Sequence, residues 1–183
     1  MYRARKNNLT TAAGRDLSGN TYYRAANQAK THGWEIEVGG RITPEWQVQA
    51  GYSQSKTRDQ DGSRLNPDSV PERSFKLFTA YHFAPEAPSG WTIGAGVRWQ
   101  SETHTNPATL RIPNPAAKAR AADNSRQKAY AVADIMARYR FNPRAELSLN
   151  VDNLFNKHYR TQPDRHSYGA LRTVNAAFTY RFK

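Results

Sequence analysis

The stretch Leu171-Arg-Thr-Val-Asn-Ala-Ala-Phe-Thr-Tyr-Arg-Phe182 decides the fold of this chain. Apolar residues occupy every second position, and polar residues fill most positions between them. This period of two predicts a β-strand, because successive side chains of a strand point to opposite faces. One face ends in the alternating aromatics Phe178, Tyr180 and Phe182, while the other carries Thr, Asn and Arg. We therefore expect an apolar medium, most naturally lipid, to cover the aromatic face.

Similar alternation recurs along most of the chain. It is found in segments 33–42, 46–55, 75–83, 91–99, 131–141 and 147–151. Residues 1–9 are a weaker candidate strand, and the polar segment 10–30, with Gly14 and Gly19, is expected to be a loop. The sequence therefore predicts an all-β protein of about seven to eight strands.

The connections between these segments alternate in length. Short connections follow Ile42, Phe83 and Phe141, and long ones follow Thr57, Thr103 and Phe155. This is the pattern of an antiparallel up-and-down transmembrane β-barrel, whose short turns face the periplasm and whose long loops lie outside the cell. The longest connection, 104–128, is expected to be irregular, with a possible short helix over 116–122.

Aromatic residues fall near the ends of the predicted strands, where girdles anchor a barrel at the two membrane interfaces. The expected girdle residues at the short-turn end are Trp46, Phe83, Trp91, Phe141, Tyr180 and Phe182. Those expected at the long-loop end are Trp34, Phe75 and Trp99.

Composition excludes several other classes of protein. The formal net charge is +12, but the basic residues are spread through loops and along one face of the alternating segments, which argues against nucleic-acid binding. The chain has no cysteine, and its five histidines show no metal-ligand spacing, so we expect no metal site. No apolar run is long enough for a membrane helix, and the first residues lack the apolar core of a secretory signal.

Several ordered motifs carry a family resemblance. In chain order they are Gly33-Trp-Glu-Ile-Glu-Val38, Leu65-Asn66 before Val70-Pro-Glu-Arg73, Gly94-Ala-Gly-Val-Arg-Trp-Gln-Ser101, Asn150-Val-Asp-Asn-Leu-Phe-Asn-Lys-His-Tyr159, Tyr168-Gly169 and the closing Tyr180-Arg-Phe182. Together they resemble the C-terminal portion of a TonB-dependent outer-membrane siderophore receptor.

The resemblance implies a fold, a location and a set of partners. Residues 1–183 would be the C-terminal part of a larger plugged barrel, a multi-pass protein of the Gram-negative outer membrane, with the plug domain and signal peptide absent. The complete receptor would take up a ferric siderophore by using the TonB system to move its own plug domain. The barrel-assembly machinery would read Phe178, Tyr180 and Phe182 as an end signal, although Lys183 follows the last aromatic.

In such a receptor the siderophore already wraps the iron, so the protein needs aromatic contacts and hydrogen bonds rather than metal ligands or a cofactor. The candidate ligand-binding residues near the outer rim are Arg98, Tyr130, Arg126, Arg165, His166 and Tyr168. Each also fits a solvated loop or an ion pair. Acidic and basic residues on the inner rows also fit a network on the wall that contacts a plug; they are Glu35, Glu37, Asp134 and Asp152 with Arg98, Arg138, Arg140 and Arg181.

Two other functions stay open at this point. A free-standing small barrel with a structural or narrow-pore role would need about eight strands, close to the number expected here. A barrel enzyme would need a nucleophile and a base on adjacent strands facing the same way, and no convincing pair is present, so no catalytic residue is assigned.

Overall fold

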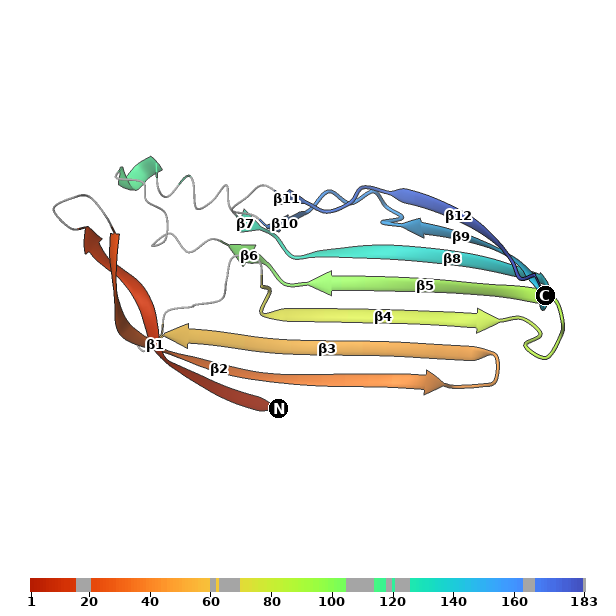
Figure 1. Ribbon diagram of the computed structural model, residues 1–183, viewed down its shortest axis with the longest axis horizontal. Helices are drawn as coiled ribbons and strands as arrows, with labels where there is room; N and C mark the ends of the chain where they lie inside the picture. Colours follow the sequence, from red (N-terminus) through yellow and green to blue (C-terminus); the bar gives the residue numbers. More distant parts are fainter. Residues whose placement is uncertain are drawn as a thin grey trace.

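The computed structural model describes residues 1–15, 21–59, 62, 70–104, 114–117, 120, 126–162 and 167–182. One antiparallel sheet of eight strands dominates it, and its strands neighbour one another in chain order (Figure 1). The strands are β1 (Tyr2–Arg15), β2 (Thr21–Arg41), β3 (Trp46–Asp59), β4 (Arg73–His82), β5 (Gly90–Gln100), β8 (Tyr130–Asn142), β9 (Ala145–Asp152) and β12 (Thr173–Tyr180).

The register between strands places the alternating apolar residues on one common face. Phe75 of β4 lies opposite Tyr52 of β3 and Trp99 of β5, and the next apolar residues along β4 continue the same match. We call this side, which also carries Trp34 and Val38 of β2, the outward face, and the opposite side the inward face. A shift by one residue would reverse every side chain, so the sequence pattern fixes this register.

No conventional core covers the outward face. Val38 is 63% exposed, Ile93 50% and Phe178 64%, although all three are apolar residues in the middle of paired strands. The inward face instead carries polar and charged side chains, including Glu35 and Lys76. This inside-out distribution is that of a barrel wall, with lipid outside and a polar lumen inside.

The two ends of the sheet differ in their connections, as the sequence predicted. Short turns join β2 to β3, β4 to β5 and β8 to β9 at the end where the C-terminus lies, which we call the short-turn rim (Figure 1). The longer connections lie at the opposite end, the long-loop rim, and carry two small two-stranded sheets. These pair β6 (Thr103–His104) with β7 (Arg126–Gln127), and β10 (Arg160–Gln162) with β11 (Ser167–Tyr168).

The prediction of a loop over 10–30 was wrong. β1 continues to Arg15 and β2 begins at Thr21, and the two pair with each other through several register shifts. Beyond the membrane a hairpin is held by its backbone hydrogen bonds and needs no apolar row, so hydrophobic alternation does not reveal it. The connection 104–128, predicted to be irregular, begins and ends in the short paired strands β6 and β7, which likewise need no apolar row. The later connection contains the pair β10 and β11. Within the first of them, residues 115–117 and 120 are helical, inside or next to the segment where a short helix was expected.

The eight-stranded sheet is open. Its edge strands are β1 and β12, and they do not pair with each other. A free-standing eight-stranded barrel requires that closure, because an unpaired edge leaves backbone groups without partners in lipid. The fold is therefore part of the wall of a larger barrel. No helix in the described residues is long and apolar enough to cross a membrane.

The assignment of the two faces predicts opposite effects at neighbouring positions of β5. Ala95→Arg places a charge on the outward face near the midplane and should destabilise a receptor that carries this chain by about 2–4 kcal/mol. Gly96→Ser should be mild, because a Cβ at Gly96 meets its nearest atoms at 3.6–3.9 Å, an ordinary contact distance. Unfolding in detergent micelles measures both, and equal losses would contradict the assignment.

Candidate functional site

An ion pair on the inward face lies near the long-loop rim. Arg98 of β5 donates from Nε and Nη2 to the carboxylate of Asp134 on β8, at 3.1 and 3.2 Å. The two residues are on adjacent strands, and Asp134 lies opposite Gly96, so the guanidinium reaches diagonally along the wall. The Arg98 side chain remains 53% exposed, which leaves part of its donor surface open to the lumen.

The same carboxylate holds a buried asparagine. The backbone N–H of Asn153, which is only 3% exposed, donates to Asp134 Oδ1 at 2.8 Å. The Asn153 side chain donates to the carbonyl oxygens of Lys157 and Ala170 at 2.9 Å and accepts from the Lys157 N–H at 2.7 Å. Asn153 therefore ties the connection after β9 to the wall strand β8 and to the segment before β12.

Two tyrosines stack beside this ion pair. Tyr130, the first residue of β8, and Tyr159 have ring centroids 4.4 Å apart with the planes inclined by 27°. Tyr130 lies opposite Gln100, on the loop side of Trp99 and outside the aromatic band. Burial, assisted by Tyr159, raises the pKa of Tyr130 to about 12, and nearby Arg98 acts in the opposite direction. The hydroxyl is therefore neutral at physiological pH and can still donate a hydrogen bond.

The loop extensions above this wall are joined to each other. Gln127 of β7 accepts a hydrogen bond from the Arg160 N–H at 2.8 Å, and the Arg160 guanidinium lies 5.8 Å from the ring centroid of Tyr168. Gly169 N–H donates to the Tyr159 carbonyl at 2.9 Å. A Cβ at Gly169 would lie only 2.0–2.4 Å from the Tyr159 ring, so no larger residue fits this close approach.

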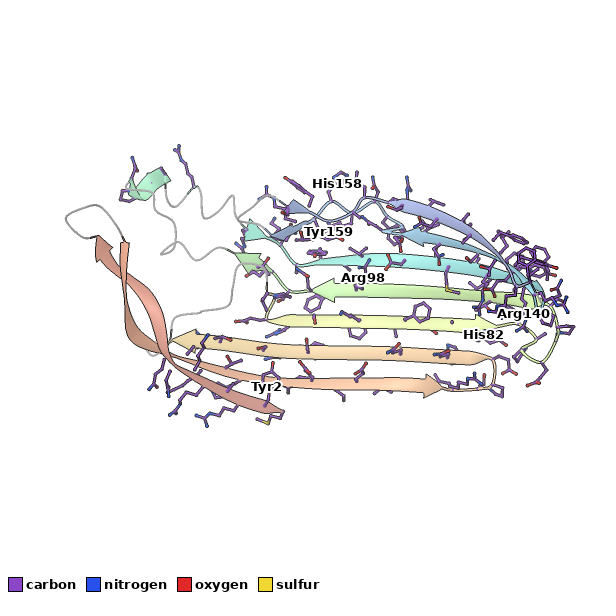
Figure 2. All side chains as sticks on the ribbon, viewed as in Figure 1. Tyr2, His82, Arg98, Arg140, His158 and Tyr159 are labelled. Carbon is purple, nitrogen blue, oxygen red and sulfur yellow. The ribbon has the colours of Figure 1, made fainter. Side chains whose placement is uncertain are left out.

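The structure brings some of the predicted ligand-binding residues together and separates others. Arg98 and Tyr130 share the inward wall, and Figure 2 shows Arg98 and Tyr159 at the same end of the sheet. Tyr168 lies on β11 and joins this group through Arg160 and the adjoining Gly169. Arg126 forms an ion pair with Glu102. Arg165 and His166 lie outside the described residues.

The opposite rim carries a larger and more basic pocket on the inward face. Its volume is about 560 Å³, against about 330 Å³ for the pocket beside Arg98. The basic residues that line the larger pocket are Arg41, His82, Arg138, Arg140, Arg144 and Arg181, and its two acidic residues are Glu86 and Glu146. Figure 2 shows His82 and Arg140 near this end. Arg140 donates to the carbonyl oxygens of Pro85 and Ala87 and thereby fixes the β4–β5 turn.

The acid–base network predicted on the inner rows forms only in part. Among the described residues it consists of the Arg98–Asp134 ion pair, while Asp152 accepts from the Asn175 amide at 3.3 Å.

The expected girdle residues lie in two groups at the two rims, and several touch other aromatics. Trp34 contacts Tyr52, and Trp91 contacts Tyr139, with ring centroids 4.9 and 4.8 Å apart. Within the described part of the chain, no cluster of His, Asp and Glu could hold a metal ion.

Comparison with known protein families identifies the same fold, a β-barrel wall. Residues 1–154 match the family model described as "TonB dependent receptor-like, beta-barrel". The chain belongs to this receptor family. Its strands therefore form part of a β-barrel of the Gram-negative outer membrane, as the sequence motifs predicted.

Relatives of this receptor barrel include proteins whose names give their ligands. The "Ferric-pyoverdine 358 receptor" of Pseudomonas putida is 32% identical over 100% of this chain and 21% of its own length. The "Catecholate siderophore receptor Fiu" of Escherichia coli K12 is 30% identical over 80% of this chain and 18% of its own length. The ferripyoverdine-bound structure of the ferripyoverdine receptor of Pseudomonas aeruginosa superposes with a TM-score of 0.75 at 27% identity, covering 97% of this chain and 24% of that one. The chain thus spans about a fifth of the length of the curated relatives it matches.

Sequence reasoning missed the central role of Asn153 and Tyr159 in this receptor rim. Both lie in the segment 150–159 that carried the family resemblance, but composition and alternation give no sign of what they contact. Their roles depend on Asp134 and Tyr130, which lie in a different strand and are brought close only by the pairing of β8 with β9.

The hydrogen bonds of Asn153 predict a strong local effect. Asn153→Gly keeps the left-handed backbone, whose φ is 51°, but removes the three side-chain hydrogen bonds, and should lower the unfolding free energy by about 1–3 kcal/mol. Asn156→Gly is the matched control, because Asn156 has the same φ and its side chain accepts one hydrogen bond, from the Arg172 N–H. Unfolding of the micelle-solubilised receptor measures both. Equal losses would show that the three side-chain hydrogen bonds of Asn153 stabilise the receptor no more than the single one of Asn156.

Proposed function

We propose that this chain forms part of the wall of an outer-membrane receptor that takes up a ferric siderophore, with energy delivered through TonB. The main support for this proposal is the match to the TonB-dependent receptor barrel family. Relatives named as receptors for ferric pyoverdine and for catecholate siderophores add to it. In this proposal residues 1–183 are the C-terminal part of the barrel, and the cargo is the chelated iron, with no resident cofactor and no catalytic step.

The long-loop rim supplies groups suited to such a cargo. A ferric siderophore presents aromatic or amide surfaces and negatively charged oxygens, so flat rings and guanidinium donors can hold it without touching the metal. The exposed part of Arg98, the neutral Tyr130 hydroxyl and the Arg160–Tyr168 pair lie on this inward and loop-side surface. We assign ligand contact to Arg98, Tyr130 and Tyr168, with Arg126, Arg165 and His166 as further candidates on the loops.

The basic pocket at the short-turn rim is suited to a contact with the receptor's own plug domain. Arg41, Arg138 and Arg181 point into the lumen at this end. Together with the other arginines that line the pocket, they outnumber its two acidic residues. Acidic side chains on a plug would complement this excess of positive charge. Such ion pairs weaken with salt when they are exposed, which suits a contact that TonB has to break during transport.

Arg98 and Tyr130 give the direct test of ligand binding. Arg98→Gln, or Tyr130→Leu, should raise the dissociation constant for the ferric siderophore by about tenfold or more, because each removes a contact to a charged or aromatic ligand. The measurement is ferric-siderophore binding by the purified receptor, begun with pyoverdines and catecholates, together with iron uptake by cells with and without TonB.

Arg144→Gln is the matched control, since Arg144 is an exposed arginine at the opposite rim. It should leave ligand binding unchanged. Unchanged binding in the Arg98 and Tyr130 variants would move the binding site away from this wall. Iron uptake that does not need TonB for any siderophore tested would overturn the transport function itself.

We also propose that the terminal aromatics act as an assembly signal for the barrel-assembly machinery. Phe178 and Tyr180 face outward on β12, and the Phe182 ring lies 4.9 Å from that of Tyr180, centroid to centroid. A purely structural anchor would contribute about 2 kcal/mol through its buried apolar area in lipid. A recognition element would act earlier, on the unfolded chain.

Phe182→Ala separates the two roles. If the machinery reads Phe182, the amount of receptor inserted in cells should fall far more than the unfolding free energy of the barrel that does insert. In a receptor whose chain ends at Lys183, deletion of Lys183 should leave insertion unchanged or improve it, because Phe182 then becomes the last residue. Quantitative blots of outer-membrane fractions and unfolding of the purified barrel provide the comparison. Insertion that simply follows stability across both variants would leave Phe182 as an anchor.

A further inference from the structure

The basic pocket at the short-turn rim concentrates positive charge on the inward face. Its basic lining residues come from β2, β4, β8, the β8–β9 turn and the end of β12, so separate parts of the wall converge on one hollow of about 560 Å³. The acidic residues Glu86 and Glu146 also line it, but the cations outnumber them. The structure describes this rim up to Phe182, and the next residue of the chain, Lys183, is basic as well.

One donor in this pocket lacks a partner. Arg140 donates from Nη2 to the carbonyl oxygens of Pro85 and Ala87, at 3.4 and 2.7 Å. Its Nε is buried and has no hydrogen-bond partner among the described residues. A buried N–H without a partner costs free energy, and the cost is larger for a charged group. An anion held in the pocket is a group that can accept from this N–H.

The inward face of β5 connects the basic pocket with the proposed ligand contacts at the long-loop rim. Between Arg98 and the short-turn rim, its inward positions carry no side chain longer than threonine; they are Gly96, Gly94, Thr92 and Gly90. Gly96 lines the pocket beside Arg98, whereas Thr92 and Gly90 line the basic pocket. Figure 2 shows Arg98 and Arg140 towards opposite ends of the sheet. A low strip of wall therefore runs from one group of cations to the other.

The charge, the size and the position of the pocket fit the cargo. Resting on the function proposed above, we infer that the basic pocket is an exit site, which binds the anionic ferric siderophore after it has left the contacts at the long-loop rim. The pocket volume lies within the range of about 300–1,000 Å³ that is usual for small-molecule sites. Guanidinium groups suit the negatively charged oxygens of such a cargo, because their planar donors can contact two oxygens at once.

The exit site and the plug contact use the same cations at different times. At rest, acidic side chains of the plug compensate the arginines of the pocket. Displacement of the plug removes that compensation and leaves like charges close together beside the lumen, which costs free energy. An anionic cargo that enters the pocket supplies the missing charge. Plug displacement is therefore less costly with an anionic cargo than with an uncharged one.

The charge of the cargo distinguishes an exit site from a contact with the plug alone. In the test variant of the complete receptor, Arg138 and Arg181 are replaced by Gln, while Arg140 is kept because it fixes the β4–β5 turn. The matched control replaces Arg3 and Arg5 by Gln, two exposed arginines on the outward side of β1. A ferric pyoverdine or ferric catecholate that the receptor takes up is prepared with a free carboxylate and as the primary amide. Binding by the purified receptor and the maximal rate of iron uptake by cells are measured for both forms.

We expect the test variant to bind both forms as tightly as the unchanged receptor, because the contacts at the long-loop rim are intact. Its maximal uptake rate should fall by about tenfold or more for the carboxylate form and by clearly less for the amide. The control variant should match the unchanged receptor in both measurements. An equal fall for the two forms would assign the pocket to the plug alone and overturn the exit site. An unchanged uptake rate would overturn it as well.

Chemical capture locates the cargo directly. The chain has no cysteine, so Thr179→Cys introduces a single thiol at an exposed position that lines the basic pocket. The same ferric siderophore, carrying a bromoacetyl group, is offered to cells whose receptor has no other cysteine. The thiolate displaces bromide and forms a thioether, which mass spectrometry of the receptor detects. We expect attachment at position 179 only in cells that have TonB, and less of it when Arg138 and Arg181 are also replaced by Gln.

Uptake and capture together separate the exit site from the transport function itself. If no ferric siderophore is taken up in a TonB-dependent manner, the proposed transport function fails, and the exit site fails with it. If uptake is normal but position 179 is not modified, or is modified equally without TonB, the exit site alone is overturned.

Discussion

The hydrogen-bond ladder between neighbouring strands is the constraint on which the rest of this structure depends. In lipid no water can satisfy a backbone N–H or C=O, so each strand has to pair along its whole membrane segment. Pairing fixes the register, and register fixes the face to which each side chain points. Apolar residues of the eight strands then gather outward and polar ones inward. The two faces therefore meet two different media.

The inward face shows how a wall can position loops. Asp134 lies within a membrane strand, yet its carboxylate binds both Arg98 on the adjacent strand and the backbone of Asn153 after β9. Asn153 then holds two further segments through its side chain. The loop that carries Tyr159 is thereby tied to the rigid ladder, and the ring stacks on Tyr130. A binding surface at a rim benefits from such anchoring, because less conformational entropy is lost when a ligand arrives.

The basic residues of this barrel wall form groups on particular faces and rims of the sheet, although they form no continuous run along the sequence. In the sequence the net charge of +12 is spread through loops and along one face of the alternating segments, a pattern that argues against nucleic-acid binding. In the structure one group of cations lines the lumen at the short-turn rim, and another lies outward at the long-loop rim. The two groups lie on opposite faces of the wall and at opposite rims. Their separation follows from strand alternation, since neighbours along the chain point to opposite sides.

The sequence alone determined the strands that cross the membrane, their inside and outside faces, the alternation of short and long connections and the receptor family. The strands and faces could be predicted because lipid burial imposes a period of two that is visible in a single segment, whereas the family followed from the resemblance of the ordered motifs. Tertiary structure decided the extended β1–β2 hairpin, the Arg98–Asp134–Asn153 contacts and the placing of Lys30 opposite Arg5 and Arg58. Each of these depends on which residues of separate strands lie opposite one another. No local pattern records that pairing, because it is set by the register of the whole sheet.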